Sequence, residues 1–115
     1  MSYDYVLSKG DVSMSLEDLM ESAANGVIGS EEMLKASITS LFPSVRWEYS
    51  TVNTPDGSAH AWSGRPSPEF LFMPEADGKV RLLFMSRCER SDVALVARNL
   101  QLVAVDEQTM EVFDG

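Results

Sequence analysis

Hydrophobic and polar side chains alternate in two segments of the chain. In residues 3–8 and 45–50 every second side chain is aromatic or aliphatic, the pattern of a strand with one buried and one wet face. The runs at residues 69–73 and 79–86 are hydrophobic on both faces, which is typical of central strands that lie under helices. Further strands are expected at residues 58–63, 102–105 and 110–113.

Three other segments carry hydrophobic residues at the spacing of one helical face. They follow Ser15, Ser30 and Ser91, whose side chains are the expected N-caps. Asn25-Gly26 is the expected left-handed end of the first helix, and Pro43 terminates the second. The buried stripe of the first helix is predicted to consist of Leu16, Leu19, Met20 and Ala23.

The predicted order of elements is β-α-α-β-β-β-β-α-β-β. Consecutive strands with helices between the blocks favour an α+β fold, a single antiparallel sheet with the helices packed mainly on one face. A length of 115 residues suits one domain over residues 1–115, and no repeat or low-complexity tract divides it.

The segment "DEQT", residues 106–109, is either an acidic site or the turn of a last hairpin. Side chains of Asp106 and Thr109 can hydrogen-bond the backbone of a turn. The D-x-[DN]-x-[DN]-G pattern of a calcium loop is absent. We therefore predict a hairpin connection and no metal site here.

The chain is strongly acidic, with eighteen acidic and nine basic residues and a formal net charge of −9. This charge disfavours nucleic acids and anionic lipid surfaces, and it would attract a basic protein. The alternative is that the acidity only maintains solubility. No apolar run is long enough for a membrane span, and residues 1–13 lack the pattern of a signal peptide, so a cytoplasmic location is expected.

His60 and Cys88 are the candidates for catalysis. His60 is the one histidine, and no G-x-S-x-G motif accompanies it, which favours a structural strand histidine. Cys88 lies between Arg87 and Arg90 ahead of the third helix, a setting that can acidify a thiol. The other interpretation, which we favour, is a buried or sluggish thiol at the strand–helix junction.

Arg81, Arg87 and Arg90 form the one local concentration of basic residues. They could bind a carboxylate or phosphate, or they could pair with surface acids. One histidine and one cysteine give no zinc-ligand spacing, and no glycine-rich phosphate loop is present. We expect neither a metal nor a cofactor.

Trp62 is the candidate anchor of an interface, because it lies in a stretch bounded by glycine and proline that we interpret as an exposed edge strand. Acidic residues in turns and at helix starts are expected to steer a basic partner. These are Glu31, Glu32, Asp56, Glu75 and Asp77.

Both ends of the chain carry a recurring pattern. "SYDYVLSKGDVSMSLEDLM" combines an aromatic-rich strand with a serine-capped helix, and "NLQLVAVDEQT" follows a helix with a strand and an Asp-x-Gln-Thr turn. The first and last 25 residues thereby resemble small bacterial α+β proteins, some uncharacterised and others immunity proteins of toxin systems. The resemblance implies a protein-binding function and assigns no catalytic residue.

The leading hypothesis is a small cytoplasmic inhibitor, of the immunity type, that occupies the surface of a basic toxin or enzyme. The second hypothesis is a small enzyme or ligand-binding domain that uses His60 or Cys88 with the arginines. The third is a structural homodimer joined through a sheet edge.

Overall fold

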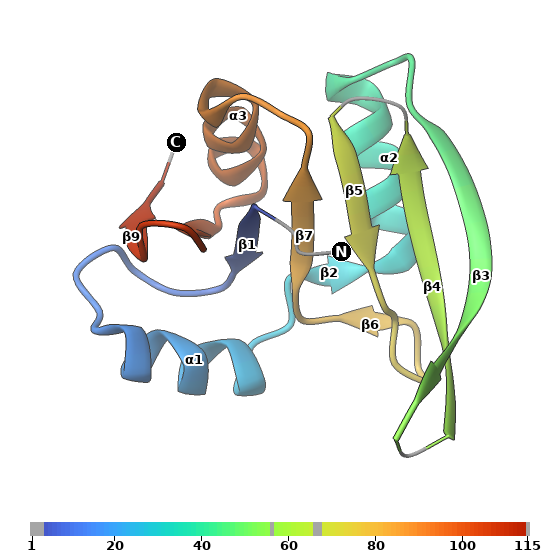
Figure 1. Cartoon of the computed structure of the whole chain (residues 1–115), viewed down its shortest axis with the longest axis horizontal. Helices are drawn as coiled ribbons and strands as arrows, with labels where there is room; N and C mark the ends of the chain where they lie inside the picture. The colour runs from blue at the N-terminus through green and yellow to red at the C-terminus, as the bar shows by residue number, and fades with distance from the viewer. Residues whose placement is uncertain (1–3, 56, 66–67, 115) are drawn as a thin grey trace.

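The computed structural model describes residues 4–55, 57–65 and 68–114 and confirms an α+β fold (Figure 1). Seven strands form one antiparallel sheet in the order β3-β4-β5-β7-β1-β8-β9. They are β1 (Tyr5–Ser8), β3 (Arg46–Thr54), β4 (Gly57–Arg65), β5 (Glu69–Phe72), β7 (Leu83–Ser86), β8 (Val103–Asp106) and β9 (Glu111–Phe113). The helices are α1 (Leu16–Asn25), α2 (Glu31–Leu41) and α3 (Arg90–Leu100).

Strand β1 lies at the interior of the sheet, between β7 and β8. Leu7 pairs with Leu83 on one side and Ala104 on the other, and all three side chains are fully buried. The strand predicted over residues 3–8 is confirmed for Tyr5–Ser8, but its second face is not wet, because Ser8 is buried as well. Tyr3 lies outside the described residues. The sequence pattern does not indicate that this strand is central.

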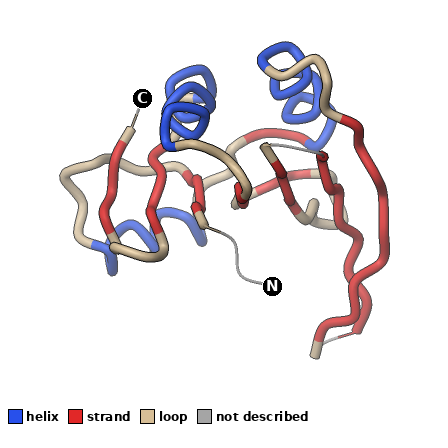
Figure 2. Tube along the Cα trace, turned by 45° about the horizontal axis from the view of Figure 1, so that its top comes forward, coloured by secondary structure: helices blue, strands red, loops and turns tan. Residues whose placement is uncertain are grey.

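Two of the three helices cover one face of the sheet, and α1 lies on the opposite face (Figure 2). On the first face, α2 and α3 pack buried side chains on the sheet residues that alternate inward. This main core includes Leu34, Ile38, Phe70, Phe72, Met85, Val93 and Val96. The arrangement agrees with the prediction that the helices pack mainly on one face.

A second, two-stranded sheet was not expected. Residues 79–86 do not form one strand, because the chain leaves β6 (Lys79–Val80) at Arg81 and enters β7 two residues later. Strand β6 pairs instead with β2 (Gly29–Ser30), directly ahead of α2. Val80 is buried in this arrangement. The hydrophobic run at residues 79–86 therefore contributes one strand to each of the two sheets.

The helix ends follow the predicted caps in part. Ser15 and Ser30 accept hydrogen bonds of 3.2 Å from Asp18 N and Met33 N, which confirms both N-caps. The prediction for Ser91 is wrong, because α3 begins earlier and Glu89 N donates to Asp92 Oδ2. The left-handed stop at Asn25-Gly26 is also wrong: Gly26 has a φ of −98° and its N–H closes the helix on a backbone carbonyl.

The "DEQT" segment connects β8 to β9 as a hairpin, which confirms its turn assignment. Asp106 Oδ1 accepts hydrogen bonds from Gln108 N at 2.9 Å and Thr109 N at 3.4 Å. Thr109 Oγ1 accepts one from Glu111 N. The side chains thus satisfy backbone donors of the turn, and the Asp106 carboxylate is occupied by the chain itself.

The turn geometry predicts that calcium does not stabilise the protein. A ligand that binds the folded state raises the melting temperature, so millimolar calcium should leave it unchanged. Asp106→Ala should lower the free energy of unfolding by about 1 kcal/mol, because two backbone donors lose an acceptor. Differential scanning fluorimetry and urea unfolding measure both effects. A calcium-dependent rise of several degrees that Asp106→Asn removes would contradict the turn assignment.

Candidate protein-binding surface

The β2–β6 pair brings together most of the interface residues predicted from the sequence. Ser30 pairs with Lys79, and Glu31 N donates to Gly78 O at 3.0 Å, so the start of α2 meets the 74–78 turn. Trp62 Nε1 donates to Glu31 Oε2 at 3.3 Å. The side chains of Trp62, Glu31, Glu75 and Asp77 therefore lie around one end of the molecule. Asp56 lies outside the described residues.

The prediction that Trp62 lies on an edge strand is wrong, because β4 runs between β3 and β5. Its ring is half-buried, and Lys35 Nζ lies 3.4 Å from the ring centroid. The exposed aromatic of this end is Tyr49 on the edge strand β3, with a 53% exposed side chain. Tyr49 stacks on His60 at 5.1 Å between ring centroids.

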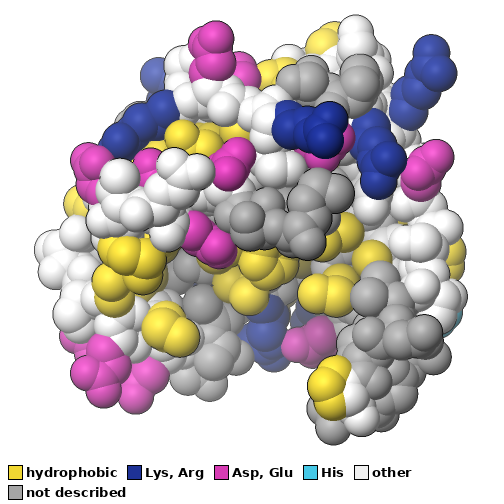
Figure 3. Space-filling model, in the orientation of Figure 1, with side chains coloured by type: hydrophobic (Ala, Val, Ile, Leu, Met, Phe, Trp, Pro, Cys, Tyr) yellow, Lys and Arg dark blue, Asp and Glu magenta, His cyan; other side chains and the backbone are white. Residues whose placement is uncertain are grey.

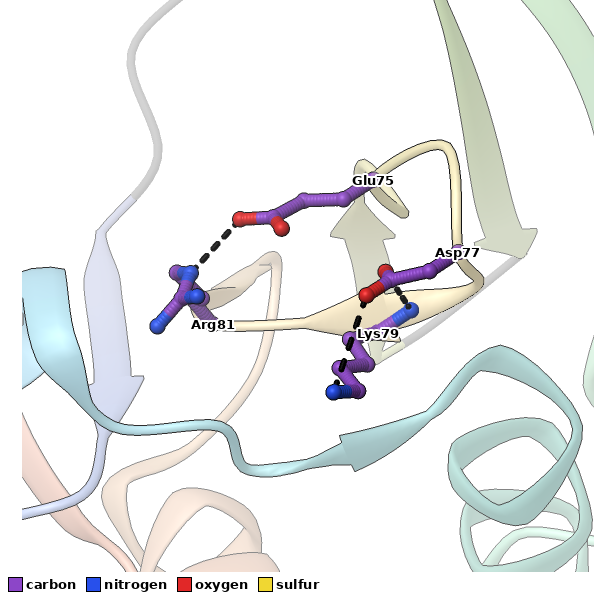
Figure 4. A network of polar contacts seen from close by, with 4 residues as sticks. All are labelled: Glu75, Asp77, Lys79 and Arg81. Atoms are coloured by element: carbon purple, nitrogen blue, oxygen red, sulfur yellow. Dashed lines mark hydrogen bonds and ion pairs between the residues drawn. The ribbon is translucent and has the colours of Figure 1, made fainter.

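The acids of this end are largely compensated by nearby cations. Glu75 Oε1 lies 2.6 Å from Arg81 Nε, and Asp77 Oδ2 lies 3.7 Å from Lys79 Nζ (Figure 4). Lys35 adds a further positive charge beside Glu31. The field that these acids present to a distant basic protein is therefore weaker than their number indicates.

Arg81, Arg87 and Arg90, which the sequence analysis grouped as a cluster of basic residues, form ion pairs with three different carboxylates. Arg87 Nε lies 3.7 Å from Glu69 Oε1, and Arg90 Nη2 lies 2.8 Å from Glu111 Oε1. Arg81 pairs with Glu75 as described above. Each of the three arginines therefore pairs with a carboxylate, as the second of the two alternatives expected, and the three carboxylates lie on different elements.

Acidic side chains gather on α1 and the turn that precedes it. Between residues 9 and 22 the chain has four acidic side chains and one basic side chain, Lys9. Hydrogen bonds from Ser13 N and Oγ hold the pKa of Asp11 below its usual value, so this carboxylate stays ionised. The exposed acids of this segment are Asp11, Glu17, Asp18 and Glu21.

Exposed hydrophobic side chains lie in the same segment. Val12 is 45% exposed and Met20 is 73% exposed. Met20 lines a cavity together with Met110 of the β8–β9 turn, which is 53% exposed, so the helix and the turn are neighbours. Figure 3 shows hydrophobic side chains on both sides of a hollow on this face. We call α1, the 10–15 turn and the 107–110 turn the α1 surface.

Met20 is the residue that the helical pattern misplaced, because the pattern assigned it to the buried stripe. Leu19 is 3% exposed and anchors α1, and Ser22 Oγ donates to Lys9 O at 3.2 Å. With Leu19 turned to the sheet, Met20 lies at the rim of the contact. The clue available from the sequence was the dense acidity around it, at Glu17, Asp18 and Glu21.

Cys88 and His60 lie on different parts of the fold, and neither lines the cavity beside α1. Burial, together with the carboxylates of Asp92 and Asp4, raises the pKa of the Cys88 thiol to about 12. Burial is the largest of these causes, and the raised pKa supports the favoured interpretation of a sluggish thiol over a thiol acidified by the flanking arginines.

In the described part of the chain, no group of three or more histidine, cysteine or acidic side chains is placed to hold a metal ion. None of the helices within the described ranges is long and apolar enough to cross a membrane. Comparison with family models, with characterised proteins and with solved structures finds no significant match.

The pKa of Cys88 predicts slow labelling of the native protein. At pH 7.4 the thiol is almost entirely protonated, and the thiolate is the nucleophile. Iodoacetamide should therefore modify the folded protein much more slowly than the same protein in guanidinium chloride, as mass spectrometry would measure. Stoichiometric modification of the native protein at the rate of the unfolded chain would be inconsistent with this environment.

Proposed function

We propose that this protein is a small inhibitor that binds a basic toxin or enzyme, and that the α1 surface makes the contact. The observation that carries the proposal is the coincidence of exposed acids with exposed hydrophobic side chains on one helix and its neighbouring turn. Acids speed encounter with a basic partner, and the hydrophobic side chains give contacts that hold the complex.

Methionine suits the second role. Met20 and Met110 have unbranched, polarizable side chains that adapt to the shape of a partner, and both are more than half exposed. Neighbouring exposed hydrophobic side chains beside an open cavity are typical of a surface that another molecule covers. A partner that covers these two side chains would remove their apolar surface from water. The surrounding acids would set the orientation in which a basic partner approaches.

Two further points support an inhibitor of the immunity type. The ends of the chain resemble immunity proteins of bacterial toxin systems, and both α1 and the β8–β9 turn belong to those ends. A cytoplasmic location, which we also propose, agrees with a single cysteine that has no partner for an internal disulfide. An immunity protein acts in that compartment when it protects the cell that makes the toxin.

The homodimer remains the competing proposal, since β3 is a nine-residue edge strand with Tyr49 exposed. A second copy could add to this edge through main-chain hydrogen bonds. Sedimentation of the protein alone separates the two, because only the homodimer forms without another protein.

Association kinetics test which acids steer the partner. The binding partner in this assay is any basic protein found to be encoded beside this gene or captured by the protein, immobilised for surface plasmon resonance. Glu17→Gln with Glu107→Gln should slow association several-fold and change dissociation little, because long-range attraction acts on the encounter. The matched control, Glu32→Gln with Asp77→Asn, removes two charges from the other end and should have a smaller effect.

If both pairs slow association equally, the α1 surface is not the steering site. If no neighbouring or captured basic protein binds at micromolar concentration, the inhibitor proposal fails as a whole.

Dissociation kinetics compare the two candidate anchors. Met20→Ala should raise the dissociation rate about tenfold, the effect of a modest hot spot. Trp62→Ala, the anchor proposed from the sequence, should change it less, because Trp62 is already engaged by Glu31 and Lys35. A larger effect of Trp62→Ala in the same assay, with the variant still folded, would move the interface to the other end.

A further inference from the structure

The cavity beside α1 is a feature of the α1 surface that the proposed protein contact does not require. It has a volume of about 510 Å³, within the range of ligand pockets. It lies between α1 and the face of the sheet opposite the main core. Its walls are mostly aliphatic and include Val6, Val105, Leu16, Leu19 and Leu82. A ligand that fills this cavity must therefore have an aliphatic body.

Two charged side chains, Arg81 and Glu107, belong to the lining, and their backbones lie at opposite ends of β1. Glu107 N donates to Asp4 O at 3.0 Å, next to the start of β1. Arg81 precedes Leu83, which pairs with Leu7 near the end of β1. Because a strand rises about 3.3 Å per residue, the two positions are at least about 10 Å apart along β1. The cavity therefore has a basic end and an acidic end.

The two charges differ in how they are already paired. Glu75 Oε1 lies 2.6 Å from Arg81 Nε, and Arg81 Nη1 is shut off from solvent. The Glu107 side chain is exposed, and no cation of the described residues forms an ion pair with its carboxylate. Glu107 is therefore the charged group of this cavity that is available to a ligand.

Met110, on the same turn as Glu107, has a backbone conformation that disfavours methionine. Its φ is 61°, in the left-handed region that glycine adopts without steric cost. Its side chain lines the cavity and is 53% exposed, so an apolar side chain lies at the opening of the acidic end. Backbone strain of this kind is frequent at ligand-binding sites.

We propose that this cavity binds a small amphiphile that has an aliphatic body and a cationic amine head, with Glu107 as the residue that binds the head. The aliphatic walls match the body, and the carboxylate attracts an ammonium group at the end of the cavity that is distant from Arg81. The net charge of −9 also attracts a cation and repels an anionic head group. This inference goes beyond the proposed function and does not depend on a protein partner.

Three probes of equal chain length test the proposal: decylamine, decanol and decanoate, each below its micelle concentration. Calorimetry in about 0.05 M salt should show that decylamine binds several-fold more tightly than decanol, the size of effect expected of one exposed ion pair. Decanoate should bind most weakly. Raising the salt to about 0.5 M should reduce the preference for the amine, because exposed charges are then screened.

Substitutions at the acidic end separate the head from the body. Glu107→Gln should remove the preference for decylamine and leave decanol binding nearly unchanged. The matched control, Glu32→Gln, removes the same charge from an exposed position on α2 and should preserve the preference. Met110→Gly should weaken the binding of all three probes by a similar factor, because its side chain contacts the aliphatic body. Glycine suits a φ of 61°, so this variant should be at least as stable as the unaltered protein.

Methionine methyl spectra locate the ligand in the unaltered protein, so the test does not depend on the folding of a variant. Decylamine should shift the methyl signals of Met20 and Met110, which line the cavity, and leave those of Met33 and Met73 in place. The proposal is overturned if none of the probes binds, if decanol or decanoate binds as tightly as decylamine, or if the preference for decylamine survives Glu107→Gln.

Discussion

The two-sided pairing of β1 is the constraint on which the rest of this structure depends. Leu7 is fully buried between β7 and β8, so the N-terminal strand joins a half made of β3, β4, β5 and β7 to a half made of β8 and β9. Without β1, the inner edges of β7 and β8 would lack partners for their backbone hydrogen bonds. Unpaired backbone groups in the interior cost free energy. The short connection after β1 then places α1 against the face of the sheet that α2 and α3 leave free.

That placement explains why α1 has two different faces. In the described part of α1, Leu19 is buried and Ser22 Oγ donates a hydrogen bond to Lys9 O. Its remaining surface carries acids and Met20, and an apolar cavity lies beside it. The exposed, flexible side chain of Met20 suits a surface that adapts to a partner.

The local elements were predictable from the sequence, and the long-range arrangement was not. The strand at residues 45–50 and the serine caps of α1 and α2 depend on neighbouring residues, and these predictions were confirmed. Tyr49, on the face predicted to be buried, is exposed because β3 lies at the edge of the sheet. The central position of β1 and the break of residues 79–86 into two strands depend on partners distant in sequence. For the same reason the sequence could not show that Glu75 and Asp77 pair with Arg81 and Lys79, since these ion pairs arise only in the fold. Helical spacing likewise could not show that Met20 lies at the rim of α1 and not beneath it.

Hydrogen exchange of the protein, alone and in complex with the proposed basic partner, tests most directly the proposal that the α1 surface is the binding surface. Backbone amides that a partner covers exchange more slowly, and mass spectrometry assigns the protection to segments. The structure predicts new protection at residues 10–22 and 107–110, with little change at residues 29–35 and 60–64. Protection confined to residues 29–35 and 60–64 would contradict the account and place the interface at the end that contains Trp62.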